Sequence, residues 1–192
     1  TTNWVYGGTF TRYWLSATAI TSTSGNYYGL FPVGQSGASS YSPLQINSTA
    51  DPTADGSFSV TFTPAGSAGT DLSPFYNDAG TNIEYIVNGS FATTVSGVTG
   101  GTYNIDATMT GLNSTGALSD IRLAIFTGGT TASAVGTHAA ATGTVVNPTA
   151  KRTGLTIADL TTKDFRLATS NKTATPLPVD FLSFDAKANG NV

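Results

Sequence analysis

Short segments in which apolar and polar residues alternate recur along most of the chain. Between residues 57 and 63, phenylalanine and valine alternate with serine and threonine, so one face is apolar and the other is hydroxylated. The same period of two appears at 82–87 and 102–110. In 121–126 the apolar residues occupy both parities, which predicts a central strand covered on both faces. These patterns predict β-strands that line a core.

Glycine, asparagine, aspartate and proline separate the segments at the intervals expected of a sandwich or barrel. Only 156–162 has a pattern that could form a helical turn. We therefore predict an all-β fold in which residues 1–192 form a single antiparallel β-sandwich domain. The sandwich would be immunoglobulin-like or jelly-roll-like, with at most one short helical turn.

Both ends of the chain carry aromatic or apolar strand candidates. Aromatic residues flank Gly7-Gly8, which predicts a hairpin within 1–20. Near the other end, 178–188 changes its apolar parity midway, which predicts a bulge or a strand that leaves one sheet for another. Either element could pair with the sheet edge of a neighbouring molecule. The residues predicted to form such a self-assembly interface are Trp4, Tyr6, Phe10, Trp14, Val179, Phe181 and Phe184.

Composition strengthens the case for association. The chain contains 34 Thr, 19 Ser and 22 Gly, whereas charged residues make up only 10%, against a typical share of about a quarter. A hydrophobic share of 39% is too high for a disordered linker. Because serine and threonine occupy the outward parity of the clearest strands, the surface is neutral and offers little repulsion to another sheet.

Charge and hydropathy exclude two classes of partner. The net charge is −3 and the eight basic residues are scattered, so no basic footprint for nucleic acid is present. No apolar run approaches the length of a membrane span, so we expect no membrane insertion. The expected partners are further copies of the chain, other cell-surface proteins, or glycans.

The sequence offers little catalytic chemistry. It has no cysteine and one histidine, His138, in a segment of small residues that is typical of a solvated loop. Glu84 lies mid-strand at a position that predicts exposure to solvent. With no nucleophile elbow and no evident pair of nucleophile and base, we expect a protein that is not an enzyme.

No cofactor is expected, although two segments contain residues that could bind a structural calcium ion. Aspartate and asparagine in 51–56 and 71–78 offer hard oxygen ligands, yet neither segment has the ligand density of an EF-hand loop. Simple turns are the alternative explanation of both segments. The ligand candidates are Asp51, Asp55, Asp71, Asn77 and Asp78.

The aromatic residues near the start of the chain suggest a second kind of site. Rings of this type stack on sugars when they are exposed, and fill a core when they are buried. The candidates for a carbohydrate-binding platform are Tyr13, Trp14, Tyr27 and Tyr28. Burial in an ordinary core is the alternative.

The segment PLPVDFLSFDAKANGNV at 176–192 resembles a stretch of Bacteroidota proteins exported by the type IX secretion system. In these proteins an LPV(E/D)LLSF-x-A strand opens the module before the sorting signal. Residues 101–126 and 147–181 are similar to the β-rich segment that often precedes it. In family members a further strand and a sorting domain follow, and this sequence ends at Val192 before them. The resemblance implies an extracellular or cell-surface β-protein and brings no catalytic residues with it.

Together these observations predict a non-enzymatic extracellular structural protein. It would be a self-assembling subunit of a surface fibre or filament, or a module of a cell-surface adhesin, with strand exchange as one mode of assembly. A carbohydrate-binding or adhesion module that uses an aromatic platform is the alternative.

Overall fold

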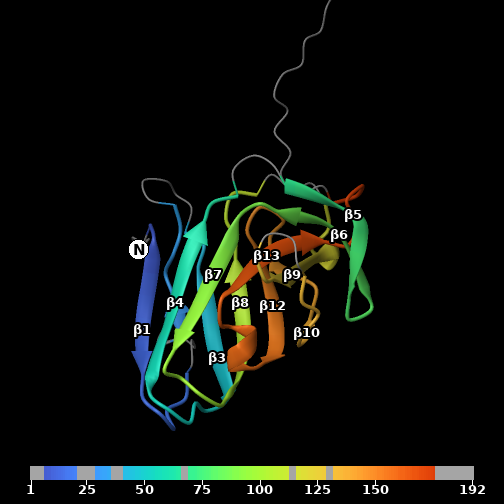
Figure 1. The fold of residues 1–192 in the computed structure, drawn as a ribbon. Helices are drawn as coiled ribbons and strands as arrows, with labels where there is room; N and C mark the ends of the chain where they lie inside the picture. The colour runs from blue at the N-terminus through green and yellow to red at the C-terminus, as the bar shows by residue number, and fades with distance from the viewer. Residues whose placement is uncertain are drawn as a thin grey trace, which may run out of the picture.

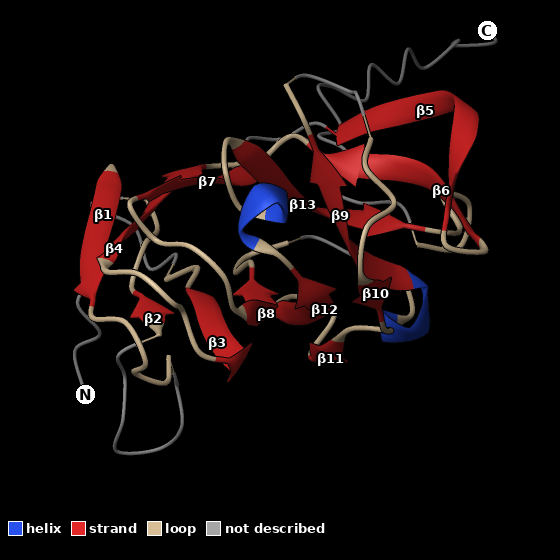
Figure 2. Ribbon diagram, turned by 60° about the horizontal axis from the view of Figure 1, so that its bottom comes forward, coloured by secondary structure: helices blue, strands red, loops and turns tan. Residues whose placement is uncertain are grey.

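The structure is a computed structural model with two antiparallel β-sheets that pack face to face (Figures 1 and 2). The prediction of an all-β sandwich is therefore confirmed. Among the residues described, no helix is long and apolar enough to cross a membrane. The structure describes residues 7–20, 29–35, 41–65, 69–112, 116–128 and 132–175.

The larger sheet has the strand order β1-β4-β7-β13-β6-β5, and β9 pairs with the remaining edge of β13. Strands β6 and β7 follow one another along the same edge of β13, because β9 pairs with the other edge. The strands are β1 (Thr9–Trp14), β4 (Gly56–Thr63), β5 (Gly69–Asp78), β6 (Thr81–Val87), β7 (Ser90–Ser96), β9 (Ile121–Phe126) and β13 (Lys163–Thr169).

The smaller sheet has the order β10-β12-β8-β3-β2, and β11 also pairs with β12. Short strands stand at both of its margins, whereas the three middle strands are seven or eight residues long. The strands are β2 (Leu30–Phe31), β3 (Leu44–Ala50), β8 (Thr102–Thr108), β10 (Thr137–His138), β11 (Thr142–Gly143) and β12 (Pro148–Leu155).

The main core lies between the sheets and is built from the alternating residues that the sequence predicted. In β4, Phe58 and Val60 are buried, and in β8, Tyr103 and Ile105 are buried, while their neighbours along each strand are more exposed. Phe58 packs on Tyr103 across the two sheets, with ring centroids 5.6 Å apart. The predicted strands at 57–63, 82–87 and 102–110 are therefore confirmed with shifts of one or two residues at their ends.

Strand β9 is covered on both faces, as predicted, but it is not central. Leu123 and Ile125 belong to the main core, whereas Ala124 and Phe126 belong to a second apolar cluster. In the described part of the chain β9 pairs along its length only with β13. Its second face is covered because β5 folds over it and Tyr76 packs edge-on against Phe126.

Two short 3₁₀ turns interrupt the strands. The turn Ile157–Asp159 lies within the predicted segment 156–162, and Asp159 accepts hydrogen bonds from the backbone N–H and the hydroxyl of Thr156. The second turn, Leu118–Asp120, was not predicted. It spans three residues directly before β9, which is too short to show a helical period.

Candidate functional site

Strand β1 is the end strand of the larger sheet as described, and its side chains alternate strictly between two faces. It pairs with β4 from Thr9 opposite Thr61 to Trp14 opposite Gly56. The odd-numbered residues of β1 are exposed, and the even-numbered residues are half-buried or buried. The strand therefore carries one hydroxylated outer face and one inner face directed at the core.

Trp14 lies on the inner face, which fits the alternative of burial in an ordinary core and not a ring that stacks on sugars. It is 6% exposed, and its ring packs 5.2 Å from that of Phe58 and 6.0 Å from that of Phe31. Tyr13, next to it, is 84% exposed. Because successive residues of a strand point to opposite faces, Tyr13 and Trp14 cannot share a platform. The alternation in the sequence already contained this signal.

Phe10 and Arg12 join β1 to the smaller sheet. The Phe10 ring meets Phe31 edge-on with centroids 6.2 Å apart, and the Arg12 guanidinium lies 5.1 Å from the Phe10 centroid. Arg12 Nε donates a hydrogen bond of 2.8 Å to the carbonyl of Leu30, and burial lowers the pKa of Arg12. Phe10 thus serves the packing between the sheets.

A small apolar notch lies where β1 ends. Tyr13 and Leu15, which is 67% exposed, are the two most exposed large hydrophobic side chains of the described residues. The loop that follows is fixed, since the Ser16 N–H donates to Asp55 Oδ1 at 2.6 Å and the Ala17 N–H to the Pro52 carbonyl at 2.8 Å. We call this feature the Tyr13–Leu15 notch; it encloses about 170 Å³ and is lined by Tyr13, Trp14, Leu15, Thr18 and Ala19.

The outer surface of β1, β4 and β7 next to the notch is an array of hydroxyl groups. Thr9 and Thr61 share a hydrogen bond of 2.6 Å across the strands, and Thr11 and Ser59 share one of 2.8 Å. No charged residue occupies the outward positions of these three strands. We call this surface the hydroxyl face; it comprises Thr9, Thr11, Ser57, Ser59, Thr61, Thr63, Thr94 and Ser96.

At the other end of the molecule a charged cluster is buried between β5 and β12. Arg152 and Asp78 are both fully buried and form two parallel hydrogen bonds of 2.6 and 2.8 Å. Arg152 also donates to the carbonyls of Val135 and Leu123, and the Tyr76 hydroxyl donates to Asp78 Oδ2 at 3.0 Å. Burial, and then the nearby charge of Asp78, raise the pKa of Tyr76. No pattern in the sequence predicts this pair, because its members are 74 residues apart.

His138 belongs to this cluster, so its prediction as a solvated loop histidine was wrong. It lies in β10, its side chain is 5% exposed, and Nε2 is 2.8 Å from the carbonyl oxygen of Asp78. Because a carbonyl only accepts, Nε2 carries the proton. Nδ1 is buried without a hydrogen-bond partner, so within the described residues His138 activates no hydroxyl group. The cluster connects β5, β9, β10 and β12 and has the character of a structural lock.

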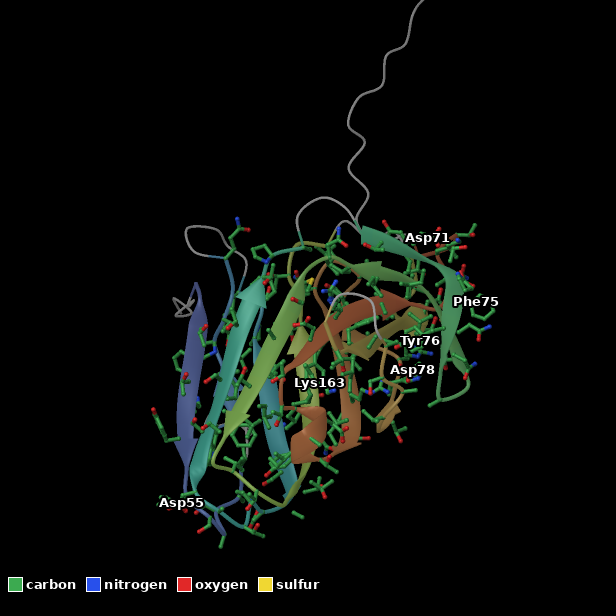
Figure 3. All side chains as sticks on the ribbon, in the orientation of Figure 1. Asp55, Asp71, Phe75, Tyr76, Asp78 and Lys163 are labelled. Carbon is green, nitrogen blue, oxygen red and sulfur yellow. The ribbon has the colours of Figure 1, made fainter. Side chains whose placement is uncertain are left out.

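The side chains considered as calcium ligands have protein partners, and the two segments lie at opposite ends of the molecule (Figure 3). The hydrogen bond from the Ser16 N–H lowers the pKa of Asp55. Asp71 forms an ion pair of 2.7 Å with Lys172. No group of three or more acidic or histidine side chains that could hold a metal ion occurs in the described part of the chain. The other candidates contact Ser48 (from Asp51), Gly80 and Asn82 (from Asn77), and Arg152 (from Asp78).

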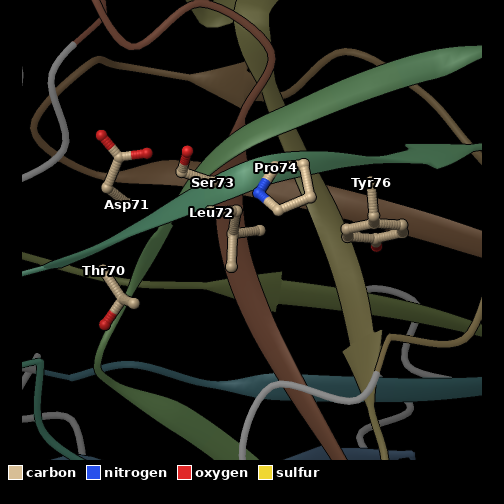
Figure 4. Close-up of a pocket in the computed structure, with 6 residues that line it drawn as sticks. All are labelled: Thr70, Asp71, Leu72, Ser73, Pro74 and Tyr76. Atoms are coloured by element: carbon tan, nitrogen blue, oxygen red, sulfur yellow. The ribbon is translucent and has the colours of Figure 1, made fainter.

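A larger cavity of about 240 Å³ follows β5, where the register against β6 shifts between Asp71 and Tyr76. Figure 4 shows Asp71 at one end of the row of lining residues and Tyr76 at the other. Three of its polar side chains already have partners: Thr70 donates to Asn88 at 2.6 Å, Asp71 pairs with Lys172, and Tyr76 donates to Asp78. The notch, by contrast, presents exposed apolar side chains. The lining residues of the larger cavity are Thr70, Asp71, Leu72, Ser73, Pro74 and Tyr76.

Several predicted site residues lie outside the described residues, together with the first half of the N-terminal hairpin and the C-terminal strand. These are Trp4, Tyr6, Tyr27, Tyr28, Val179, Phe181 and Phe184. Comparisons of the chain with protein-family models, with curated proteins and with solved structures found no match.

Proposed function

We propose that the protein is a non-enzymatic structural subunit that associates with copies of itself, as part of an extracellular fibre or as a module of a cell-surface adhesin. The Tyr13–Leu15 notch carries the proposal. Exposed apolar side chains that line a depression mark an interaction site more often than isolated ones do. Within the described residues, the notch also lies at the end of the last strand of the larger sheet.

The hydroxyl face supports the same proposal. Surface charges normally keep sheets of different molecules apart, and the outward positions of β1, β4 and β7 carry none. The hydroxyl groups of Thr9 and Thr61, and of Thr11 and Ser59, already hydrogen-bond to each other. Covering them would therefore leave fewer polar groups without a partner than covering charged residues would.

Electron microscopy and light scattering of the purified full chain test the proposal. We expect filaments, or oligomers whose mass rises with protein concentration. Deletion of residues 1–8 or of 178–192, the two predicted strand-exchange elements, should leave monomers. A monodisperse monomer at every concentration would refute self-association, and fibres that survive both deletions would refute strand exchange.

A glycan-binding module is the second candidate, and the exposure of Tyr13 favours it. Its ring is 84% exposed, and by register it adjoins Ser57 of the hydroxyl face, so an aromatic surface and hydroxyl groups lie side by side. A glycan array separates the two candidates. Glycan binding that Tyr13→Ala abolishes, in a chain that stays monomeric, would favour this module over self-association.

A further inference from the structure

The Tyr13–Leu15 notch and the point at which the chain leaves the described structure lie at opposite corners of the molecule. Thr175 is fully buried, and its hydroxyl donates to Asp120 Oδ2 at 2.8 Å and accepts from the Ala117 N–H at 3.0 Å. These contacts fix the exit of the chain beside the start of β9. Strand β9 pairs with the edge of β13 that faces away from β7, and β1 lies on the β7 side of the sheet.

The strand registers give the separation of the two corners. From β1 to β9 there are four strand spacings, by way of β4, β7 and β13, which amounts to about 19 Å. Along the strand direction, Trp14 and Ile121 are ten residues apart in register, or about 33 Å. The straight line between the corners is therefore about 38 Å.

Three of the apolar residues that follow Thr175 are too close to it in the sequence to cover this distance within one molecule. Val179, Phe181 and Phe184 are four, six and nine residues beyond Thr175. A fully extended chain places them at most about 14, 22 and 32 Å from the exit. The notch of the same molecule is out of reach of all three, whereas the notch of a neighbour is not.

We propose that residues 176–192 of one molecule occupy the Tyr13–Leu15 notch of a second copy. This inference rests on the proposed function and names the contact that produces assembly. The segment supplies the apolar residues Val179 and Phe181 on one parity, which suit a notch lined by Tyr13 and Leu15. The outward positions of β1, β4 and β7 carry no charged residue, so the charged residues of the segment, Asp180, Asp185 and Lys187, meet no like charge on the hydroxyl face.

Donor and acceptor are different surfaces, so the contact is head-to-tail. Where the exchange is not reciprocal within a pair, each added molecule leaves one notch and one C-terminal segment available, and the assembly grows as a ring or a filament. Because the two surfaces lie at opposite corners, successive copies extend in one direction.

Cysteine cross-linking of the full chain tests the contact, because the natural sequence contains no cysteine. One variant carries Leu15→Cys, and others carry Phe181→Cys or Phe184→Cys. Val146→Cys, an exposed apolar position away from the notch, is the matched control for Leu15→Cys. Single-cysteine proteins of different mass tags are mixed and oxidised, and covalent heterodimers are counted on a non-reducing gel.

We expect Leu15→Cys to form heterodimers with a C-terminal cysteine several-fold more efficiently than Val146→Cys does. A chain that carries both cysteines should give a ladder of covalent oligomers. An intramolecular disulfide, or yields no higher than the control at both C-terminal positions, would overturn the inference. If the wild-type chain still assembles in that case, the proposed function stands without this contact; if it is monomeric throughout, both fail.

Discussion

The two ends of the molecule differ in where their charged residues lie. The outward positions of β1, β4 and β7 carry hydroxyl groups and no charged residue, and this surface ends in the exposed Tyr13–Leu15 notch. Around β5, β9 and β12 charged groups are present, and the pair Arg152–Asp78 is sealed inside. We infer that the buried ion pair stabilises one end of the fold, and we propose that the uncharged surface at the other end associates with further copies.

The largest expected effect comes from breaking the lock. Arg152→Met leaves the carboxylate of Asp78 buried without its partner, so we expect a loss of about 3–5 kcal/mol in the free energy of unfolding. Lys151→Met, at the next residue, removes a partly exposed contact of 3.8 Å to Asp106 and should cost under about 1 kcal/mol. Urea denaturation followed by fluorescence measures both, and equal effects would show that the buried pair is no lock.

The difference between a buried and an exposed side chain can also be tested within β1, on the adjacent residues Tyr13 and Trp14. Trp14→Ala opens a cavity against Phe31 and Phe58 and should cost about 3–5 kcal/mol of folding stability. Tyr13→Ala removes an exposed ring and should change stability by less than about 0.5 kcal/mol. Thermal unfolding of both variants checks this. A strongly destabilised Tyr13→Ala variant would contradict the assignment of Tyr13 to the outer face.

Tyr103, which packs on Phe58 of β4, is a buried titratable residue whose side chain is neutral at pH 7. Burial and the charge of Asp51 raise the pKa of Tyr103 to about 12, and its hydroxyl donates to the Gly100 carbonyl at 3.0 Å. Since the folded-state pKa exceeds the unfolded value of about 10, the associated stability is present below pH 10. It is lost as the pH rises toward 12. Tyr103→Phe should lose part of this alkaline dependence in pH-jump denaturation, and an unchanged profile would refute the assignment.

A smaller effect is expected from placing a charge on the hydroxyl face. Ser59→Lys introduces a cation between β1 and β7, which a neighbouring molecule would have to desolvate. We expect assembly to weaken a few-fold with little change in stability. Thr142→Lys, an exposed position in β11 of the other sheet, is the control. If light scattering shows that Ser59→Lys assembles as well as the wild type, the hydroxyl face is not part of the interface.

The sequence allowed the core strands to be predicted because their signal is local. In β4 and β8 the alternation of apolar residues reports directly which side chains are buried. Strand β5 was not recognised, because Ser73-Pro74 and the register shift after Asp71 interrupt its pattern. In β1 the alternation was present, and reading it strictly would have separated Tyr13 from Trp14.

The buried cluster and the notch depend on contacts that no local pattern contains. Arg152 meets Asp78 only after two sheets have formed, and His138 is buried only because β10 pairs with β12. Leu15 has no periodic signal, since it follows the last residue of β1. Its exposure results from the way the loop is held by Asp55 and Pro52.

Sedimentation velocity of the full chain over a range of concentrations tests the central claim most directly. The wild type should form oligomers that grow with concentration. Leu15→Asp, which places a charge in the notch, should sediment as a folded monomer, and the matched control Val146→Asp should behave like the wild type. A wild type that remains monomeric, or a Leu15→Asp variant that assembles as well as the wild type, would contradict association through the notch.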